Sequence, residues 1–104
     1  MPVAQFGDRL RFVVWLSAQT LGVDSGKELA AVLKKGSGQL SSWVNEKPRP
    51  SWDNIRLIAD TVGVNARWLD DPMSKDAVEP ELFAAWWKPR AEKLLAAEPQ
   101  RRRA

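Results

Sequence analysis

Glycine and proline divide the chain into short segments, and each segment has the apolar spacing of a helix. Between these breaks, apolar residues recur three and four positions apart, as expected for helices that bury one face. The predicted helices cover residues 5–21, 27–35, 37–46, 52–62 and 64–69. We therefore expect an all-α fold with five helices in residues 1–72. Residues 73–104 are expected to form a linker, a C-terminal helical extension and a basic tail.

Residues that favour helix ends stand at the predicted breaks. Side-chain oxygens that accept the free N–H groups of a new helix are offered by Asp24 or Ser25, Ser37, Ser51 and Asn65. Gly36 and Gly63 stand where helices commonly end in a left-handed residue. Pro48 and Pro50 terminate the third predicted helix, because proline lacks the N–H that a helix interior needs.

The predicted core consists of the apolar stripes of these helices. Its members are Phe6, Leu10, Val13, Val14, Leu21, Leu29, Ala30, Val32, Leu33, Leu40, Trp43, Val44, Ile55, Ile58, Ala59, Val62, Trp68 and Leu69. The apolar run from Phe12 to Leu16 covers more than one face of the first helix. Either this helix is buried on two sides within the chain, or part of the run meets a partner.

Composition removes several classes of function. The chain has no Cys and no His, which excludes disulfides, thiolate zinc sites and a histidine general base. We expect no enzyme activity, no metal and no cofactor. No apolar run reaches the roughly 20 residues of a membrane span, and no secretory signal is recognisable. A cytoplasmic, nucleoid-associated protein is expected.

Residues 36–51 form the candidate functional element. Leu40, Trp43 and Val44 are predicted to face the core, which leaves an uncharged polar face made of Gln39, Ser42 and Asn45, with Ser41 at its edge. Such side chains both donate and accept hydrogen bonds, as contact with base edges requires. Lys47 and Arg49 follow in a turn where a phosphate backbone could pass.

The basic charge of the chain is concentrated around this element. Five cations and two acids lie between Lys34 and Arg56, and the resulting charge equals the +3 of the whole chain. This local excess of positive charge favours contact with nucleic acid over ordinary surface charge.

The sequence resembles the λ-repressor-like helix-turn-helix family, of the Cro and xenobiotic-response-element type, over residues 6–72. The matching strings are Phe6-Gly7, Arg9-Leu10-Arg11, Glu28-Leu29-Ala30, Leu40-Ser41-Ser42-Trp43, Lys47, Arg49-Pro50-Ser51, Ile58-Ala59, Gly63-Val64 and Trp68-Leu69. The resemblance implies a sequence-specific DNA-binding transcriptional regulator, repressor-like and of phage or bacterial type. It also implies a recognition helix at about residues 37–46 in the major groove of double-stranded DNA, and a homodimer on two half-sites.

The resemblance also assigns roles to individual residues. Its base-reading positions correspond to Ser37, Gly38, Gln39 and Ser42, with Ser41 beside them. Its phosphate contacts correspond to Asn45, Lys47, Arg49 and the start of the fourth helix near Asn54. We expect additional contacts with the DNA backbone from Lys27, Lys34 and Lys35.

Three departures from the family pattern are visible. Gly26 stands where the family often has a phosphate-bracing Gln, and Lys34 replaces the usual turn glycine, whose role we expect Gly36 to take two residues later. The first helix and its loop are about five residues longer than in typical members. Gly26, together with Gly38 in the recognition helix, favours an alternative function: a protein-interaction module or antitoxin-like adaptor that retains the fold.

The C-terminal extension carries large apolar residues. Pro80 suits the first turn of a helix, and Pro89 is expected to kink or divide the helical pattern. An apolar side is formed by Leu82, Phe83, Trp86, Trp87, Leu94 and Leu95. This segment either folds back on the domain or forms a homodimer through Trp86 and Trp87. The basic residues 100–103 would add salt-sensitive affinity for DNA.

Overall fold

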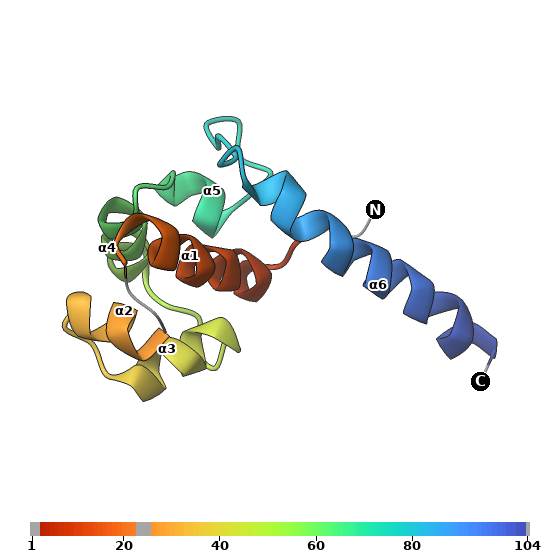
Figure 1. Ribbon diagram of the computed structural model, residues 1–104, viewed down its shortest axis with the longest axis horizontal. Helices are drawn as coiled ribbons and strands as arrows, with labels where there is room; N and C mark the ends of the chain where they lie inside the picture. Colours follow the sequence, from red (N-terminus) through yellow and green to blue (C-terminus); the bar gives the residue numbers. More distant parts are fainter. Residues whose placement is uncertain (1–2, 23–25, 104) are drawn as a thin grey trace.

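The computed structural model of the chain describes residues 3–22 and 26–103, and of Ser37 and residues 98–103 it describes the backbone alone. The described residues form six helices and no strand (Figure 1), which confirms the all-α class. The helices are α1 (Phe6–Thr20), α2 (Gly26–Val32), α3 (Ser37–Val44), α4 (Trp52–Val62), α5 (Ala66–Asp70) and α6 (Phe83–Arg103). None of these helices combines the length and apolar character that crossing a membrane requires.

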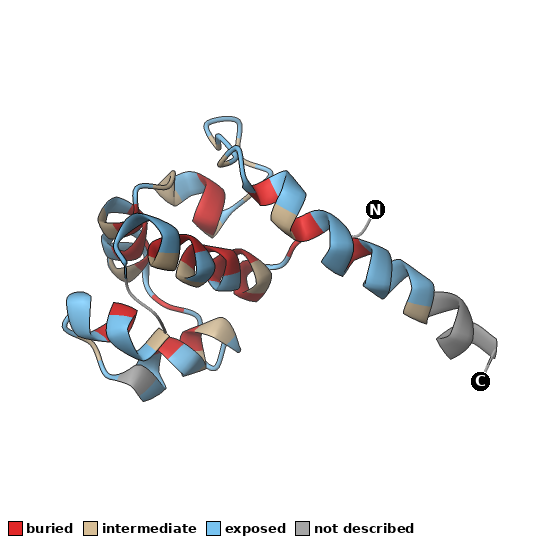
Figure 2. Ribbon diagram, viewed as in Figure 1, coloured by how far each residue is buried: buried red, intermediate tan, exposed pale blue. Residues whose placement is uncertain are grey.

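Helix α1 is the centre of the fold and contacts α2, α3, α4 and α5. Its first turn is stabilised by Asp8, whose carboxylate accepts the Gln5 N–H at 3.1 Å and complements the helix dipole. Phe12 and Val13 are fully buried and Leu16 is nearly so, whereas Trp15 remains 39% exposed. The helix is therefore buried on two sides within the chain, and most of its length is coloured as buried in Figure 2. Of the apolar run, only Trp15 presents a large exposed surface.

Local capping explains where several helices begin and end. Ser51 Oγ accepts the Asn54 N–H at 3.4 Å, and Asn65 Oδ1 accepts the Trp68 N–H at 2.9 Å. Gly63 ends α4 with φ of 94°, a left-handed conformation that costs glycine little. These three predictions are confirmed, and the predicted caps Asp24 and Ser25 lie outside the described residues.

Helices α2 and α3 both end earlier than predicted. Beyond Val32, the Lys35 N–H donates to Ala30 and the Lys34 N–H to Ala31, which closes the helix in a Schellman turn. Lys34 itself is the left-handed residue, with φ of 59°. The prediction that Gly36 takes this role is wrong: Gly36 is extended, with φ of −71°, and it rather than Ser37 is the N-cap of α3.

Helix α3 stops at Val44 instead of residue 46 for the same reason. The Lys47 N–H donates to Ser42 and the Glu46 N–H to Trp43, with Glu46 left-handed at φ of 55°. The Schellman turn therefore ends the helix before Pro48, which follows Lys47 through a cis peptide bond.

Most of the predicted core is buried, with two clear exceptions. Leu21 is 43% exposed because it lies just beyond α1, where the chain leaves the helix. Val32 is 50% exposed because α2 is short and its inward stripe is filled by Leu29, Ala30 and Leu33.

Helix α6 runs without interruption from Phe83 to Arg103, so the predicted division at Pro89 and start near Pro80 are wrong. Pro89 and Ala85 are both exposed, and water can therefore bind the Ala85 carbonyl that lacks a donor at Pro89. The first half of α6 packs on the domain as the fold-back alternative expects, with Phe83, Trp87 and Ala91 buried.

The apolar core continues across the predicted domain boundary. The Phe12 ring centroid lies 5.3 Å from that of Phe83 and 6.1 Å from that of Trp68. The division after residue 72 stays a prediction.

The second half of α6 projects from the body and makes 46 Å the longest dimension of the molecule (Figure 1).

Candidate nucleic-acid interface

Helix α3 is held against α1 and α2 by its apolar side. Leu40 and Trp43 are 3% and 4% exposed, and α3 contacts both neighbouring helices. The approach to α1 is close at Gly7, where an added Cβ would lie 2.3 Å from the Val44 carbonyl oxygen. The orientation of α3 is therefore fixed by packing, so its opposite face points away from the core.

The outer face of α3 carries the predicted base-reading residues. Gly38, Gln39, Ser41 and Asn45 are exposed and Ser42 is half-buried, whereas the side chain of Ser37 lies outside the described part. Within that part, the side-chain amide of Gln39 has no hydrogen-bond partner. This amide can therefore donate and accept at once, as two hydrogen bonds to an adenine edge require.

Ser42 and Asn45 are partly engaged with their own helix. Ser42 Oγ donates to the Gly38 carbonyl, and Asn45 Nδ2 donates to the Ser41 carbonyl, each at 3.0 Å. Both side chains keep an oxygen that accepts further hydrogen bonds. Ser42 and Asn45 can therefore accept hydrogen bonds from DNA through these oxygens, whereas the free amide of Gln39 can both donate to a base edge and accept from it.

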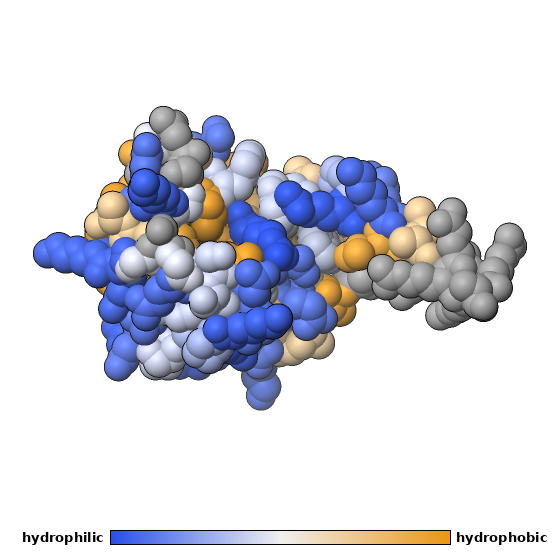
Figure 3. Space-filling model, turned by 90° about the horizontal axis from the view of Figure 1, so that it is seen from below, coloured by the Kyte–Doolittle hydropathy of each residue, from blue (hydrophilic) through white to orange (hydrophobic). Residues whose placement is uncertain are grey.

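The lysines near α3 have no ion-pair partner among the described residues. Lys27 and Lys47 are exposed and Lys35 is half-buried. Seen from below, the molecule shows pale, weakly polar residues surrounded by strongly hydrophilic ones (Figure 3). Unpaired cations of this kind can neutralise phosphates and release counterions.

Arg49 differs from these lysines because its guanidinium is already occupied. Nη2 donates to the Asp70 carboxylate at 2.8 Å and to the Asp70 backbone carbonyl. The guanidinium also lies over the Phe6 ring, 4.7 Å from the ring centroid. Arg49 therefore ties the turn after α3 to α5 and α1, and its predicted contact with phosphate would compete with Asp70.

The start of α4 is also partly satisfied within the chain. The Asn54 N–H donates to Ser51 Oγ, and Asp53 places a carboxylate in the first turn. A negative charge there opposes an approaching phosphate, so Asn54 is the least favoured of the predicted phosphate contacts.

Neither Gly26 nor Gly38, the two glycines that favour the alternative function, is required by crowding among the described residues. Among the described residues, a Cβ at Gly38 would meet no atom within 4 Å. At Gly26 the nearest atoms would be those of Leu40 and Val14, at the ordinary contact distances of 3.6 and 3.8 Å. The absence of a side chain at Gly38 thus leaves room outside the molecule, where a second backbone can approach closely.

Arg9 has a structural role that the sequence analysis missed. It is 3% exposed, and it donates to the carbonyls of Ala4, Leu69 and Asp70. Burial, followed by the positive charge of Arg49, lowers the pKa of the Arg9 guanidinium, and Asp71, Glu46 and Asp70 act in the opposite direction. The available signals were its place three residues after Phe6, within the apolar stripe, and its membership of the matching string Arg9-Leu10-Arg11.

Comparison with protein-family models, with curated proteins and with solved structures finds no match for the chain. The placement of its own side chains therefore carries the functional argument.

Proposed function

We propose that the chain is a sequence-specific DNA-binding transcriptional regulator with a λ-repressor-like helix-turn-helix, in which α2 supports α3 and α3 enters the major groove. The single observation that carries the proposal is the exposed, unpartnered amide of Gln39 on a helix whose other side is anchored by Leu40 and Trp43. A rigid helix that offers such an amide can distinguish adenine from the other bases by about 1–3 kcal/mol.

In this proposal the backbone contacts come from lysines. Lys27, Lys35 and Lys47 have no ion-pair partner among the described residues, so no ion pair would have to break before their ammonium groups bind phosphate. Arg49 acts mainly by holding the turn that carries Lys47. The protein would act as a repressor-like homodimer on two half-sites one helical turn apart, with Leu94 and Leu95 of α6 available for pairing because they are 45% and 42% exposed.

The test is selection of bound duplexes from a random DNA pool at physiological salt, with the Gln39→Ala variant in parallel. We expect the wild type to select a motif containing an adenine that the variant no longer requires, because the variant lacks the amide. Gln19→Ala serves as the matched control, since it removes an exposed amide from α1, outside the proposed recognition helix. Selection of no motif by the wild type would contradict sequence-specific binding.

A second function is favoured by the projecting half of α6. A protein-interaction module or antitoxin-like adaptor would use the exposed Leu94 and Leu95 to hold a partner protein. The variant Leu94→Ser/Leu95→Ser, in the full chain, separates the two functions. Loss of a protein partner in a chain that selects no DNA motif would identify the adaptor role, whereas a change from paired half-sites in the wild type to single half-sites in the variant would identify the dimer.

A further inference from the structure

An apolar groove of about 410 Å³ lies where α1, α2, α3 and α6 meet. Its apolar walls come from Val14 and Trp15 of α1, Leu40 and Val44 of α3, and Trp86 of α6. Trp15 is 39% exposed although it sits on the central helix of the fold. Covering the exposed part of this side chain with another apolar group would remove apolar surface from water and would therefore be favourable.

Both indoles of the groove are held by a single buried ring. The centroid of Phe12, which is fully buried, lies 5.7 Å from that of Trp15 and 5.5 Å from that of Trp86. The two indoles therefore belong to one packed cluster that joins α1 to α6. The groove is preformed, so a ligand would not have to order its walls.

Cations line the rim of this groove. The charged residues among its described lining are Arg11, Lys27 and Arg90, and no acid occurs in that set. Arg11 is partly neutralised by Asp8 at 3.3 Å. Lys27 and Arg90 make no ion pair with any described residue.

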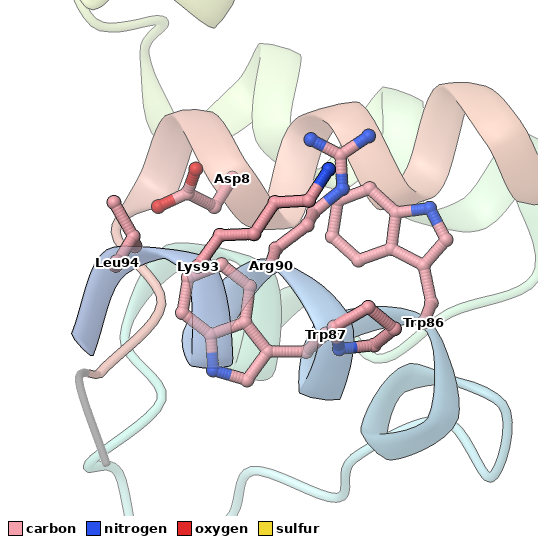
Figure 4. A pocket seen from close by; sticks show the side chains of 7 residues that line it. Asp8, Trp86, Trp87, Arg90, Lys93 and Leu94 are labelled. Atoms are coloured by element: carbon pink, nitrogen blue, oxygen red, sulfur yellow. The ribbon is translucent and has the colours of Figure 1, made fainter. Parts of the chain in front are cut away.

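Arg90 is positioned by Trp86. Its guanidinium lies over the indole, 4.3 Å from the ring centroid. Figure 4 looks into the neighbouring hollow and shows Arg90 extending along Trp86, while Asp8 lines that hollow and not the groove. A cation held above an aromatic face keeps N–H groups for an anion.

We propose that this groove binds a small aromatic carboxylate. The aromatic body would lie against Trp15 and the apolar side chains of α3, and the carboxylate would be held by Arg90 and Lys27. The volume lies within the range of about 300–1,000 Å³ that is typical of small-molecule sites. The excess of cations on the rim selects an anion over a neutral or cationic aromatic compound.

The position of the groove links it to the proposed DNA-binding helix. Leu40, Ser41 and Val44 of α3 line one wall, so a bound ligand touches the helix proposed to enter the major groove. If that function holds, ligand and DNA affect each other's affinity reciprocally. This coupling rests on the proposed function, whereas ligand binding does not.

The test uses the full chain without DNA and follows the indole N–H signals of its six Trp residues by ¹H–¹⁵N NMR. The probe is 2-naphthoate, compared with the neutral 2-naphthalenemethanol. We expect naphthoate to shift the signals of Trp15 and Trp86 to saturation, with those of Trp52 and Trp68 unchanged. Naphthoate should bind about tenfold more tightly than the alcohol, because only the acid forms charge-assisted hydrogen bonds.

Matched variants locate the site. Trp15→Ala and Arg90→Gln should each weaken naphthoate binding about tenfold. Trp52→Ala and Lys88→Gln remove an exposed Trp and an exposed cation outside the groove, and should leave binding unchanged. Arg90 is exposed, so its variant keeps the test valid even if Trp15→Ala unfolds.

Three results would overturn the proposal. Equal affinities for 2-naphthoate and 2-naphthalenemethanol would show that the cations on the rim do not contribute to binding. Shifts at Trp52 without shifts at Trp15 would place the ligand elsewhere. Trp15 and Trp86 shifts that depend on protein concentration and not on naphthoate would assign the groove to a second copy of the chain. A DNA-selection experiment that fails while naphthoate still binds would reject the proposed regulator and leave the groove assignment intact.

Discussion

The guanidinium of Arg9 donates two hydrogen bonds, at 3.2 and 3.1 Å, to the backbone carbonyl of Leu69 at the end of α5. The last carbonyls of a helix have no partner within the helix itself. Arg9 satisfies them from α1 and also bonds the Asp70 carbonyl at 3.3 Å. A positive charge at the carboxyl end of α5 also complements its dipole, so this contact fixes α5 on the central helix.

Replacing Arg9 should strongly destabilise the fold. Arg9→Leu keeps the apolar volume but leaves buried carbonyls without donors, and we expect a loss of about 3 kcal/mol in the free energy of unfolding. Urea denaturation followed by circular dichroism measures this loss. Arg11→Leu, on the exposed side of the same helix, is the matched control and should change stability by less than about 0.5 kcal/mol. Equal effects of the two variants would contradict the role of Arg9.

Gly7 should tolerate no side chain. In Gly7→Ala the new Cβ would lie 2.3 Å from the backbone carbonyl of Val44, so α3 must move away from α1. We expect a loss of about 2 kcal/mol despite the better helix propensity of Ala. Gly38→Ala has open space around the Cβ and should gain about 1 kcal/mol. Thermal unfolding of the two variants measures both changes in stability. A stabilised Gly7→Ala would contradict the close approach of α3 to α1.

Lys34 and Lys35 should respond in opposite ways to the same substitution. Lys34 is left-handed with φ of 59°, whereas Lys35 has no positive φ. Lys34→Gly should therefore gain about 1 kcal/mol, and Lys35→Gly should lose up to about 1 kcal/mol through the greater entropy of the unfolded chain. Both variants remove one cation, so a difference in their urea midpoints reports backbone conformation. Identical midpoints would rule out the left-handed assignment.

Lys47 and Arg49 should affect DNA binding differently. Lys47→Ala should weaken binding similarly for all sequences, and it should reduce the magnitude of the slope of log affinity against log salt by about 0.9. Arg49→Ala breaks the pair with Asp70 and the contact with Phe6, and should lower thermal stability while changing the salt slope less. Filter binding at several salt concentrations, beside thermal unfolding, separates these effects. A stable Arg49→Ala protein with the reduced slope would show that Arg49 contacts phosphate directly.

Features decided by neighbouring residues could be predicted from the sequence. Ser51, Asn65 and Gly63 act on backbone groups within four or five positions, so the residue types sufficed. The apolar stripes likewise placed Trp43 and Trp68 in the core. The left-handed Lys34 and Glu46 could not be predicted, because nothing in a lysine or a glutamate favours that conformation.

Features that join distant segments were the ones missed. The role of Arg49 depends on Asp70, which lies 21 positions away. The groove requires α1, α3 and α6 to meet, and the sequence left open whether α6 folds back at all. For the candidate site, the exposed face of α3 was predictable from its period, but not which of its side chains have partners.

The aromatic cluster around Phe12 can be completed only late in the synthesis of this protein. Phe12 lies on the first helix, but the rings of Phe83 and Trp86 that cover it belong to the last one. Because the chain leaves the ribosome from its N-terminus, α1 can assemble with α2 to α5 while one side of the Phe12 ring is still exposed to solvent. The nascent domain therefore carries an open apolar site on its central helix until α6 emerges, and it is most exposed to chaperones and to aggregation during that interval.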